Sequence, residues 1–240
     1  AVLSLRLNRL SAHDATAEME PAAQSSIEYT INNSVQGTVV LPDSTVVTLN
    51  SGSSLRLADD FNCSTRTVYL DGEGYFDVSH NKSKPFLIKT PQEILVTVTG
   101  TRFNVKCYCS DPKFDLTLLQ GSVDVTTKAN EVIHVHPSQQ IVISNEFHSV
   151  ENVARPDLSL AWKDGILRFD NTSMSEAIGR IERWYGVKVI VEDESVYRSS
   201  FTAEFRHETL AEVLKLLCIT SRLEYTENDG VLSLKKSSKQ

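Results

Sequence analysis

The stretch from Val68 to Val105 constrains the fold of this chain more than any other, and it reads VYLDGEGYFDVSHNKSKPFLIKTPQEILVTVTGTRFNV. Short runs of β-branched and aromatic residues alternate there with polar residues, and turn-forming residues separate the runs. This pattern is typical of antiparallel β structure. Asp71-Gly72 lies between the runs 68–70 and 73–78, and an Asp-Gly pair readily adopts the positive φ angles of a two-residue turn. We therefore predict a hairpin that turns at Asp71-Gly72.

The same rhythm extends on both sides of this stretch, and no convincing helical period occurs between residues 27 and 150. Many short strands at regular spacing predict an antiparallel β-sandwich or jelly roll, with a β-solenoid as the alternative. The spacing does not decide between them. The other expected strands are 27–31, 38–41, 46–49, 54–57, 65–70, 114–120, 122–126, 131–135, 139–143 and 147–150.

The pattern changes after Pro156, where two segments show helical periodicity. The first runs from Ser173 to Tyr185 and ends before Gly186, as helices commonly do. The second has apolar residues from Leu210 to Cys218. Ser173 with Glu176, and Thr209 with Glu212, have the spacing of capping boxes.

These two segments form an ungapped repeat of 36 residues, since Phe169 aligns with Phe205 and Met174 aligns with Leu210. Each copy reads as strand, helix, strand. We predict a small α+β domain with two helices on one face of a sheet, and we expect Trp162 to Gly165 to dock it on the β domain. Its expected strands are 165–170, 187–191, 200–205, 223–226 and 231–234.

Three regions follow from this pattern. Residues 1–26 are rich in Ala, Ser and Glu and are predicted to be a membrane-proximal linker, residues 27–155 an all-β domain, and residues 156–240 the α+β domain with the repeat. No run of about twenty apolar residues occurs, so no membrane-spanning helix is predicted. The abrupt start AVLSL suggests the trailing end of an apolar segment upstream.

The charge of the chain argues against a nucleic-acid-binding function. The net charge is −7 and the pI is about 5.4, whereas nucleic-acid-binding proteins normally carry a basic patch or stripe.

The sequence offers few groups for catalysis. His134 and His136 share a strand face and could begin a metal site, but a metal site needs at least a third ligand, for which Asp124 and Glu131 are the neighbours in sequence. The carboxylate pairs Asp59-Asp60, Asp71/Glu73 and Asp193/Glu194 are interpreted as solvated turn formers. No nucleophile elbow, phosphate loop or dinucleotide fingerprint occurs, so we predict no enzyme activity, metal or cofactor.

Four cysteines, Cys63, Cys107, Cys109 and Cys218, leave the redox state open. Cys107 and Cys109 lie two apart, on the predicted apolar face with Phe103 and Val105, so buried thiols are favoured. A disulfide from Cys63 to Cys107 or Cys109 remains the alternative in an oxidising compartment.

Several blocks together resemble the FecR family. They are VVLPDSTVVTLNSGSSL (39–55), VYLDGEGYFDV (68–78), KPFLIKT (84–90), VTGTRFNV (98–105) and LLQGSVDV (118–125), in the family's order and at its intervals. Trp162-Lys163-Asp164-Gly165 and the unit behind it resemble the family's C-terminal domain in Bacteroidetes-type bacteria, which is similar to the short N-terminal domain of secretins and TonB-dependent transducers. The family usually has Gly where this chain has Ser44 and Ser138.

This resemblance implies the periplasmic part of an anti-sigma factor anchored in the bacterial inner membrane. Its expected partner is the N-terminal signalling domain of a TonB-dependent outer-membrane transporter. The sigma factor would bind a cytoplasmic segment. We expect this chain to contain neither that segment nor the membrane helix. The family has no catalytic residues, so none are expected here.

The partner-binding surface is expected on the α+β domain, at an exposed strand edge or on the helix face with Arg180 and Arg183. The rivals are a carbohydrate- or ligand-binding β domain and a cupin-like metal enzyme. The predicted partner-binding residues are Arg168, Asp170, Arg180, Arg183, Trp184, Tyr197, Arg198, Val231, Leu232 and Ser233.

Overall fold

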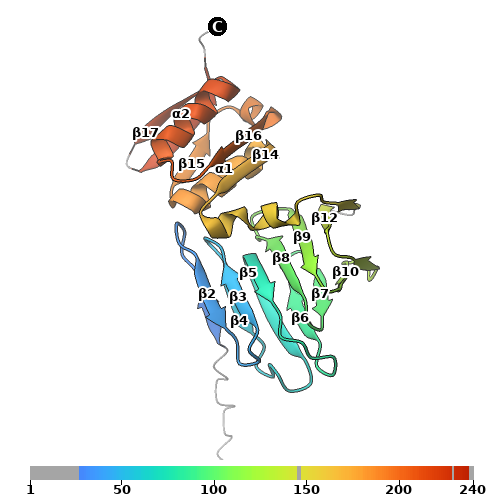
Figure 1. The fold of residues 1–240 in the computed structure, drawn as a ribbon. Helices are drawn as coiled ribbons and strands as arrows, with labels where there is room; N and C mark the ends of the chain where they lie inside the picture. Colours follow the sequence, from blue (N-terminus) through green and yellow to red (C-terminus); the bar gives the residue numbers. More distant parts are fainter. Residues whose placement is uncertain (1–26, 145–146, 229, 238–240) are drawn as a thin grey trace, which may run out of the picture.

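A computed structural model describes residues 27–144, 147–228 and 230–237. The predicted linker, residues 1–26, lies outside the described residues. Two bodies stand end to end (Figure 1), and each has its own apolar core, one within residues 41–143 and one within residues 167–234. We call them the β domain and the C-terminal domain.

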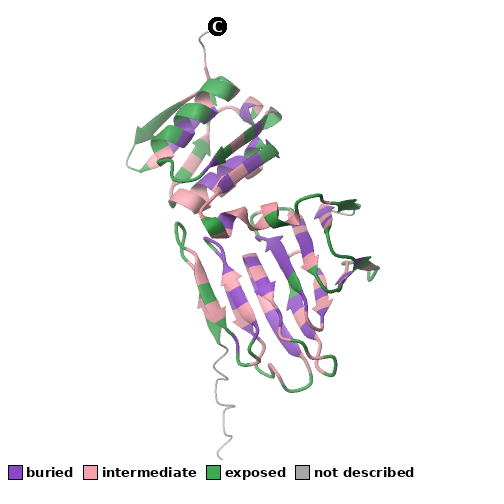
Figure 2. Cartoon of the chain, in the orientation of Figure 1, coloured by how far each residue is buried: buried purple, intermediate pink, exposed green. Residues whose placement is uncertain are grey.

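The β domain is one large sheet of thirteen strands that folds over into two layers and nearly closes into a barrel. Many residues of these strands are buried (Figure 2), and their apolar side chains form the core of the domain. The mainly β and α+β class predicted from the sequence is confirmed. The strands are β1 (Glu28–Thr30), β2 (Gly37–Val40), β3 (Val46–Leu49), β4 (Ser54–Leu57), β5 (Arg66–Asp77), β6 (Phe86–Lys89), β7 (Leu95–Val98), β8 (Arg102–Cys107), β9 (Lys113–Gln120), β10 (Val123–Thr126), β11 (Val132–Val135), β12 (Gln139–Ser144) and β13 (Phe147–Asn152).

The strand pairing excludes the solenoid alternative, because a solenoid stacks parallel coils. Among the described strands of this domain only β5 and β6 pair in parallel, and the other pairs are antiparallel. One layer runs β1-β4-β5-β6-β7-β10-β11 and the other runs β2-β3-β5-β8-β9-β12-β13. Strand β5 belongs to both.

The predicted hairpin at Asp71-Gly72 is wrong, because β5 runs through it as one strand of 12 residues. Its first half pairs with β4 and β6, and from Gly72 onward it pairs with β3 and β8. Gly72 has φ 136°, and a Cβ there would lie 2.3 Å from the Ser53 hydroxyl oxygen. Glycine therefore lets the strand cross from one layer to the other, rather than reverse.

Two turns where the FecR family usually has glycine keep the glycine conformation in this chain. Ser44 has φ 68° and Ser138 has φ 64°, both in the left-handed region. The substitutions have therefore left the turn geometry in place, at the modest energetic cost of a non-glycine residue in that region.

The C-terminal domain differs from the prediction in one respect, because its strands form two sheets instead of one. Strands β14 and β16 pair with each other, and β18 pairs with β15 on one side and β17 on the other. Each helix contacts strands of both sheets, so the apolar stripes are covered from two sides. The elements are η1 (Pro156–Asp164, a 3-10 helix), β14 (Leu167–Ser173), α1 (Met174–Tyr185), β15 (Lys188–Val191), η2 (Glu194–Arg198, a 3-10 helix), β16 (Ser200–Phe205), α2 (Leu210–Ser221), β17 (Leu223–Asn228) and β18 (Val231–Lys236).

The two helices confirm the repeat, since both begin and both end 36 residues apart. Thr209 and Glu212 form the full capping box on α2. Ser173 caps α1 by accepting from the Glu176 backbone N–H, but the Glu176 side chain does not complete a box. It turns instead to the β domain, because cations lie there.

Replacing Gly72 tests the crossing. We expect Gly72→Ala to lower the free energy of unfolding by about 3 kcal/mol, since the new methyl meets Ser53 at an unfavourable φ. The matched control is Gly165→Ala, which has φ 72° but no atom within 4 Å of its Cβ; it should cost about 1 kcal/mol. Urea denaturation measures both, and equal losses would contradict the crossing role.

Candidate functional site at the domain junction

The outer face of one β-domain layer is polar where the C-terminal domain covers it. In register, Glu73 on β5 lies opposite Lys106 on β8, which lies opposite Asp115 on β9. The next row contains Asn104 and Thr117. The Glu73 carboxylate accepts from the amides of Asn50 at 2.8 Å and Asn104 at 3.0 Å. Glu73 is therefore a member of a side-chain network, not the solvated turn former that the sequence suggested.

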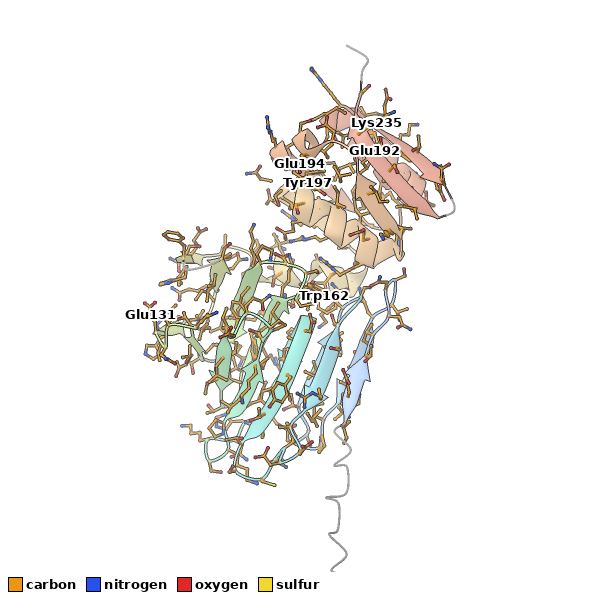
Figure 3. The ribbon with its side chains drawn as sticks, turned by 180° about the vertical axis from the view of Figure 1, so that it is seen from behind. Glu131, Trp162, Glu192, Glu194, Tyr197 and Lys235 are labelled. Atoms are coloured by element: carbon orange, nitrogen blue, oxygen red, sulfur yellow. The ribbon has the colours of Figure 1, made fainter. Side chains whose placement is uncertain are left out.

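Helix η1 lies against this polar face and contributes Trp162, which Figure 3 labels at the junction. The Trp162 indole N–H donates to the Asn104 side-chain oxygen at 3.3 Å, and the Trp162 carbonyl accepts from the Gln36 amide at 2.6 Å. The Lys163 ammonium lies 3.7 Å from the centre of the Tyr75 ring. The expected docking role of the segment from Trp162 to Gly165 is thus confirmed for its first two residues.

Helix α1 adds charge to the same place. The Glu176 carboxylate is in ion-pair contact with Lys106 of the β domain and accepts from Arg180, one helical turn along, at 2.5 Å. Lys113 approaches its second oxygen at 3.7 Å. Only 14% of the Glu176 side chain and 10% of the Lys106 side chain are exposed. A buried carboxylate that bridges cations from both domains therefore fastens them together. We call Glu73, Lys106, Asp115, Glu176 and Arg180 the junction cluster.

The pKa values in the junction cluster reflect competition between burial and charge. Burial raises the pKa of Glu176, but the charges and hydrogen bonds of Lys106 and Arg180 outweigh it and lower this pKa to about 2. For Asp115, burial outweighs the Gln140 hydrogen bonds and the Lys106 charge, so its pKa is raised. Glu176 is thus held ionised as the bridging anion, whereas Asp115 takes up a proton more readily than an ordinary aspartate.

A second contact joins the end of α1 to the loops of the β domain. The Arg183 guanidinium lies 3.9 Å from the centre of the Tyr108 ring, and the Arg183 carbonyl accepts from the Ser34 N–H at 2.9 Å. The Tyr108 hydroxyl in turn donates to the Ser51 carbonyl at 2.9 Å.

Between these contacts lies a cavity of ≈ 710 Å³ with walls from both domains and from η1. The β domain contributes Asp115, Thr117 and Gln140, and the C-terminal domain contributes Arg168 and Trp184. Both tryptophans of the chain, Trp162 and Trp184, line it. The cavity is thus bounded by the same side chains that hold the domains together.

The structure places half of the predicted partner-binding residues at this junction. Arg168, Asp170, Arg180, Arg183 and Trp184 line the cavity. The helix face with Arg180 and Arg183 is therefore turned to the β domain and is not a free surface, because the polar sheet face below it attracts these cations.

The other predicted residues lie elsewhere. Val231, Leu232 and Ser233 lie on β18, which is paired on both sides and offers no strand edge, so the expectation of an edge there is wrong. The single-sided strands of that sheet are β15 and β17. Tyr197 and Arg198 lie on η2 and are exposed. In Figure 3, Tyr197 lies in the C-terminal domain, away from Trp162.

The cysteines and histidines do not add a chemical site. All four cysteines are free. Cys107 is buried, but Cys109 is exposed, which corrects the prediction, because β8 ends at Cys107 and the chain turns away from the apolar face.

His134 lies 2.7 Å from Asp124, and no group of three or more potential metal ligands occurs in the described part of the chain.

Sequence reasoning missed Lys106, Asn104 and Asp115. Their alternation with apolar residues marks the outer face of a half-buried strand, and such a face usually meets water. One signal was available, since charges of alternating sign fall in register across three neighbouring strands. That signal requires knowing the strand order.

Breaking the junction cluster gives a second prediction. We expect Glu176→Gln to lower the free energy of unfolding by about 3 kcal/mol, because the buried Lys106 loses its closest anion and keeps only the longer pair with Asp111, at 3.8 Å. Glu204→Gln, which affects the solvent-accessible pair with Arg206 and the long contact with Arg168, is the matched control and should cost no more than about 0.5 kcal/mol. Urea denaturation followed by tryptophan fluorescence measures both.

The low pKa of Glu176 also predicts that its contribution to the free energy of unfolding depends on pH. Because the folded pKa of Glu176 is about 2, below its ordinary 4.5, its contribution is present above about pH 4.5 and disappears as the pH falls towards 2. The stability difference between the unmodified chain and Glu176→Gln should therefore shrink over that interval. A constant difference would contradict an ionised Glu176.

Comparison with known proteins agrees with the sequence resemblance. Residues 28–124 match the family model described as FecR protein, and residues 166–233 match the model described as FecR, C-terminal. No curated protein matches the chain. No helix among the described residues is long and apolar enough to cross a membrane.

Two solved structures, both titled "putative anti-sigma factor" from Parabacteroides distasonis ATCC 8503, have a similar fold. The one at 2.50 Å has a TM-score of 0.82 and 29% identity, and covers 89% of this chain and 100% of the other. The one at 1.65 Å has a TM-score of 0.81 and 29% identity, with 88% and 100% covered. The similarity of the C-terminal domain to the short domain of secretins stays a prediction. The β domain and the C-terminal domain thus match, in turn, the two family models of FecR proteins, and the chain has the fold of those two structures.

Proposed function

We propose that this chain is the periplasmic, signal-receiving part of a membrane-anchored anti-sigma factor. It has no enzymatic role. Its C-terminal domain contacts the N-terminal signalling domain of a TonB-dependent outer-membrane transporter, and the contact is relayed to a sigma factor bound by a cytoplasmic segment. The FecR matches and the two structures support the anti-sigma role.

The buried junction supports the relay. Charged and aromatic side chains of α1 and η1 are fixed on the β domain by Lys106, Asn104 and Tyr108. A partner that displaces α1 must separate buried charges, so a force or shape change at the C-terminal domain is transmitted to the β domain instead of being absorbed by a loose linker.

The junction also narrows the choice of partner surface. Because Arg180 and Arg183 face the β domain, we place the contact around η2 and the single-sided strand β15. Tyr197 is 45% exposed there, and Ile190 on β15 is 46% exposed. Arg198 is exposed beside them in sequence. Exposed tyrosine and arginine are the residue types that most often dominate binding energy at interfaces.

Binding of the chain to the signalling domain of a TonB-dependent transporter from the same genome tests the proposal. Titration calorimetry should detect a complex, and Tyr197→Ala should weaken it at least about tenfold. Phe147→Ala is the control, since Phe147 is an exposed aromatic residue (83%) on the β domain, and it should bind as the unmodified chain does.

The outcomes separate the two parts of the proposal. A complex lost in Phe147→Ala and kept in Tyr197→Ala would move the contact to the β domain. No complex with any such signalling domain would refute transporter sensing.

A further inference from the structure

The cavity at the domain junction has the position and size of a small-molecule site. Ligand sites occur preferentially between domains and commonly measure about 300–1,000 Å³, and this one measures ≈ 710 Å³. The proposed function does not use it, because Tyr197 and Ile190 are not among its lining residues.

The β-domain wall has hydrogen-bonding capacity that the protein does not use. Thr117 lines the cavity, and its hydroxyl makes no hydrogen bond to a described residue. Gln140 donates through its amide nitrogen to both oxygens of Asp115, at 2.9 and 2.8 Å, and its own oxygen has no partner in that part of the chain. Asp115 receives only this one donor group, although a carboxylate accepts several hydrogen bonds.

The wall formed by the C-terminal domain also has hydrogen-bonding groups that the protein uses little. The indole N–H of Trp184 donates to no group in the described ranges. The Arg168 guanidinium makes only long contacts, 3.5 Å to Glu204 and 3.6 Å to Asp170. Acceptors and one hydroxyl on the β-domain wall therefore line the same cavity as the loosely held Arg168 guanidinium and the Trp184 indole on the C-terminal wall.

A ligand that matches this arrangement must donate to one wall and accept from the other, and must carry apolar faces for the indoles. A sugar hydroxyl is both donor and acceptor. The two carboxylate oxygens of Asp115 and the guanidinium nitrogens of Arg168 can each bind two neighbouring hydroxyls of a sugar ring. The C–H face of the same sugar ring can pack on an indole. A simple anion fits less well, because carboxylates share the walls with the guanidinium groups.

We propose that the junction cavity binds a neutral mono- or disaccharide, held by Asp115, Thr117 and Gln140 on one domain and by Arg168 and Trp184 on the other. Because the ligand contacts both domains, its binding stabilises their present arrangement. The chain would then respond to a small molecule in addition to a protein partner.

Titration of the whole chain with glucose, galactose, mannose, N-acetylglucosamine, maltose, cellobiose and lactose tests this. Both tryptophans line the cavity, so their fluorescence reports occupancy directly. We expect at least one sugar to bind saturably with a Kd of about 1 mM or tighter and to raise the unfolding temperature.

Matched variants locate the binding. Thr117→Val removes one hydroxyl without changing side-chain shape and should weaken binding about tenfold. Thr97→Val is the control, because Thr97 lies on β7 in the other layer, outside the cavity; it should leave the Kd unchanged. Saturable binding by none of the sugars would mean that only water fills the cavity and would overturn the proposal, as would equal Kd values for the unmodified chain and Thr117→Val. Neither result would bear on transporter binding.

Discussion

The structure depends first on one residue without a side chain. Strand β5 belongs to both layers of the β domain, and it can cross between them only because Gly72 packs against Ser53 at a φ of 136°. The crossing also sets which side chains face outward in the second half of the strand. Glu73 and Tyr75 point to the outer face there, opposite Lys106 and Asn104 on β8. A backbone property in the β domain thus decides what the C-terminal domain meets.

The β-domain surface that the C-terminal domain contacts is polar, so the junction is held by ion pairs and hydrogen bonds. An apolar interface would bind the domains through area alone, whereas this one uses Glu176 between Lys106 and Arg180, with Trp162 bonded to Asn104. Such contacts are directional and hold one arrangement, but each depends on its partners remaining in place. This combination suits a protein that holds one arrangement until a signal changes it.

Much of the fold could be predicted from the sequence, because it rests on local patterns. Helical periodicity, with Ser173 before it and Gly186 after it, predicted the bounds of α1, and Thr209 with Glu212 predicted a real capping box. The same local reasoning failed at Asp71-Gly72, where a turn sequence is overridden by pairing with four neighbouring strands. The predicted capping box of Ser173 and Glu176 was wrong for a related reason, since the Glu176 side chain pairs with cations of the β domain.

The junction could not be predicted because it depends on contacts between distant segments. Lys106 and Glu176 are separated by 70 positions, and nothing local indicates that the outer face of β8 is covered. Only the segment from Trp162 to Gly165 could be linked to docking beforehand, through its place at the entry to the repeat. That the α1 face with Arg180 and Arg183 lies against the β domain could not be predicted for the same reason, because the sequence does not show which helix face is already occupied.

A double-mutant cycle on Lys106 and Glu176 tests the central claim most directly. If the buried pair fastens the two domains, the stability losses of Lys106→Met and Glu176→Gln will not add, and the coupling will be about 1–3 kcal/mol. Losses that add to within about 0.5 kcal/mol would show that the two side chains do not stabilise the junction together, and would contradict the account.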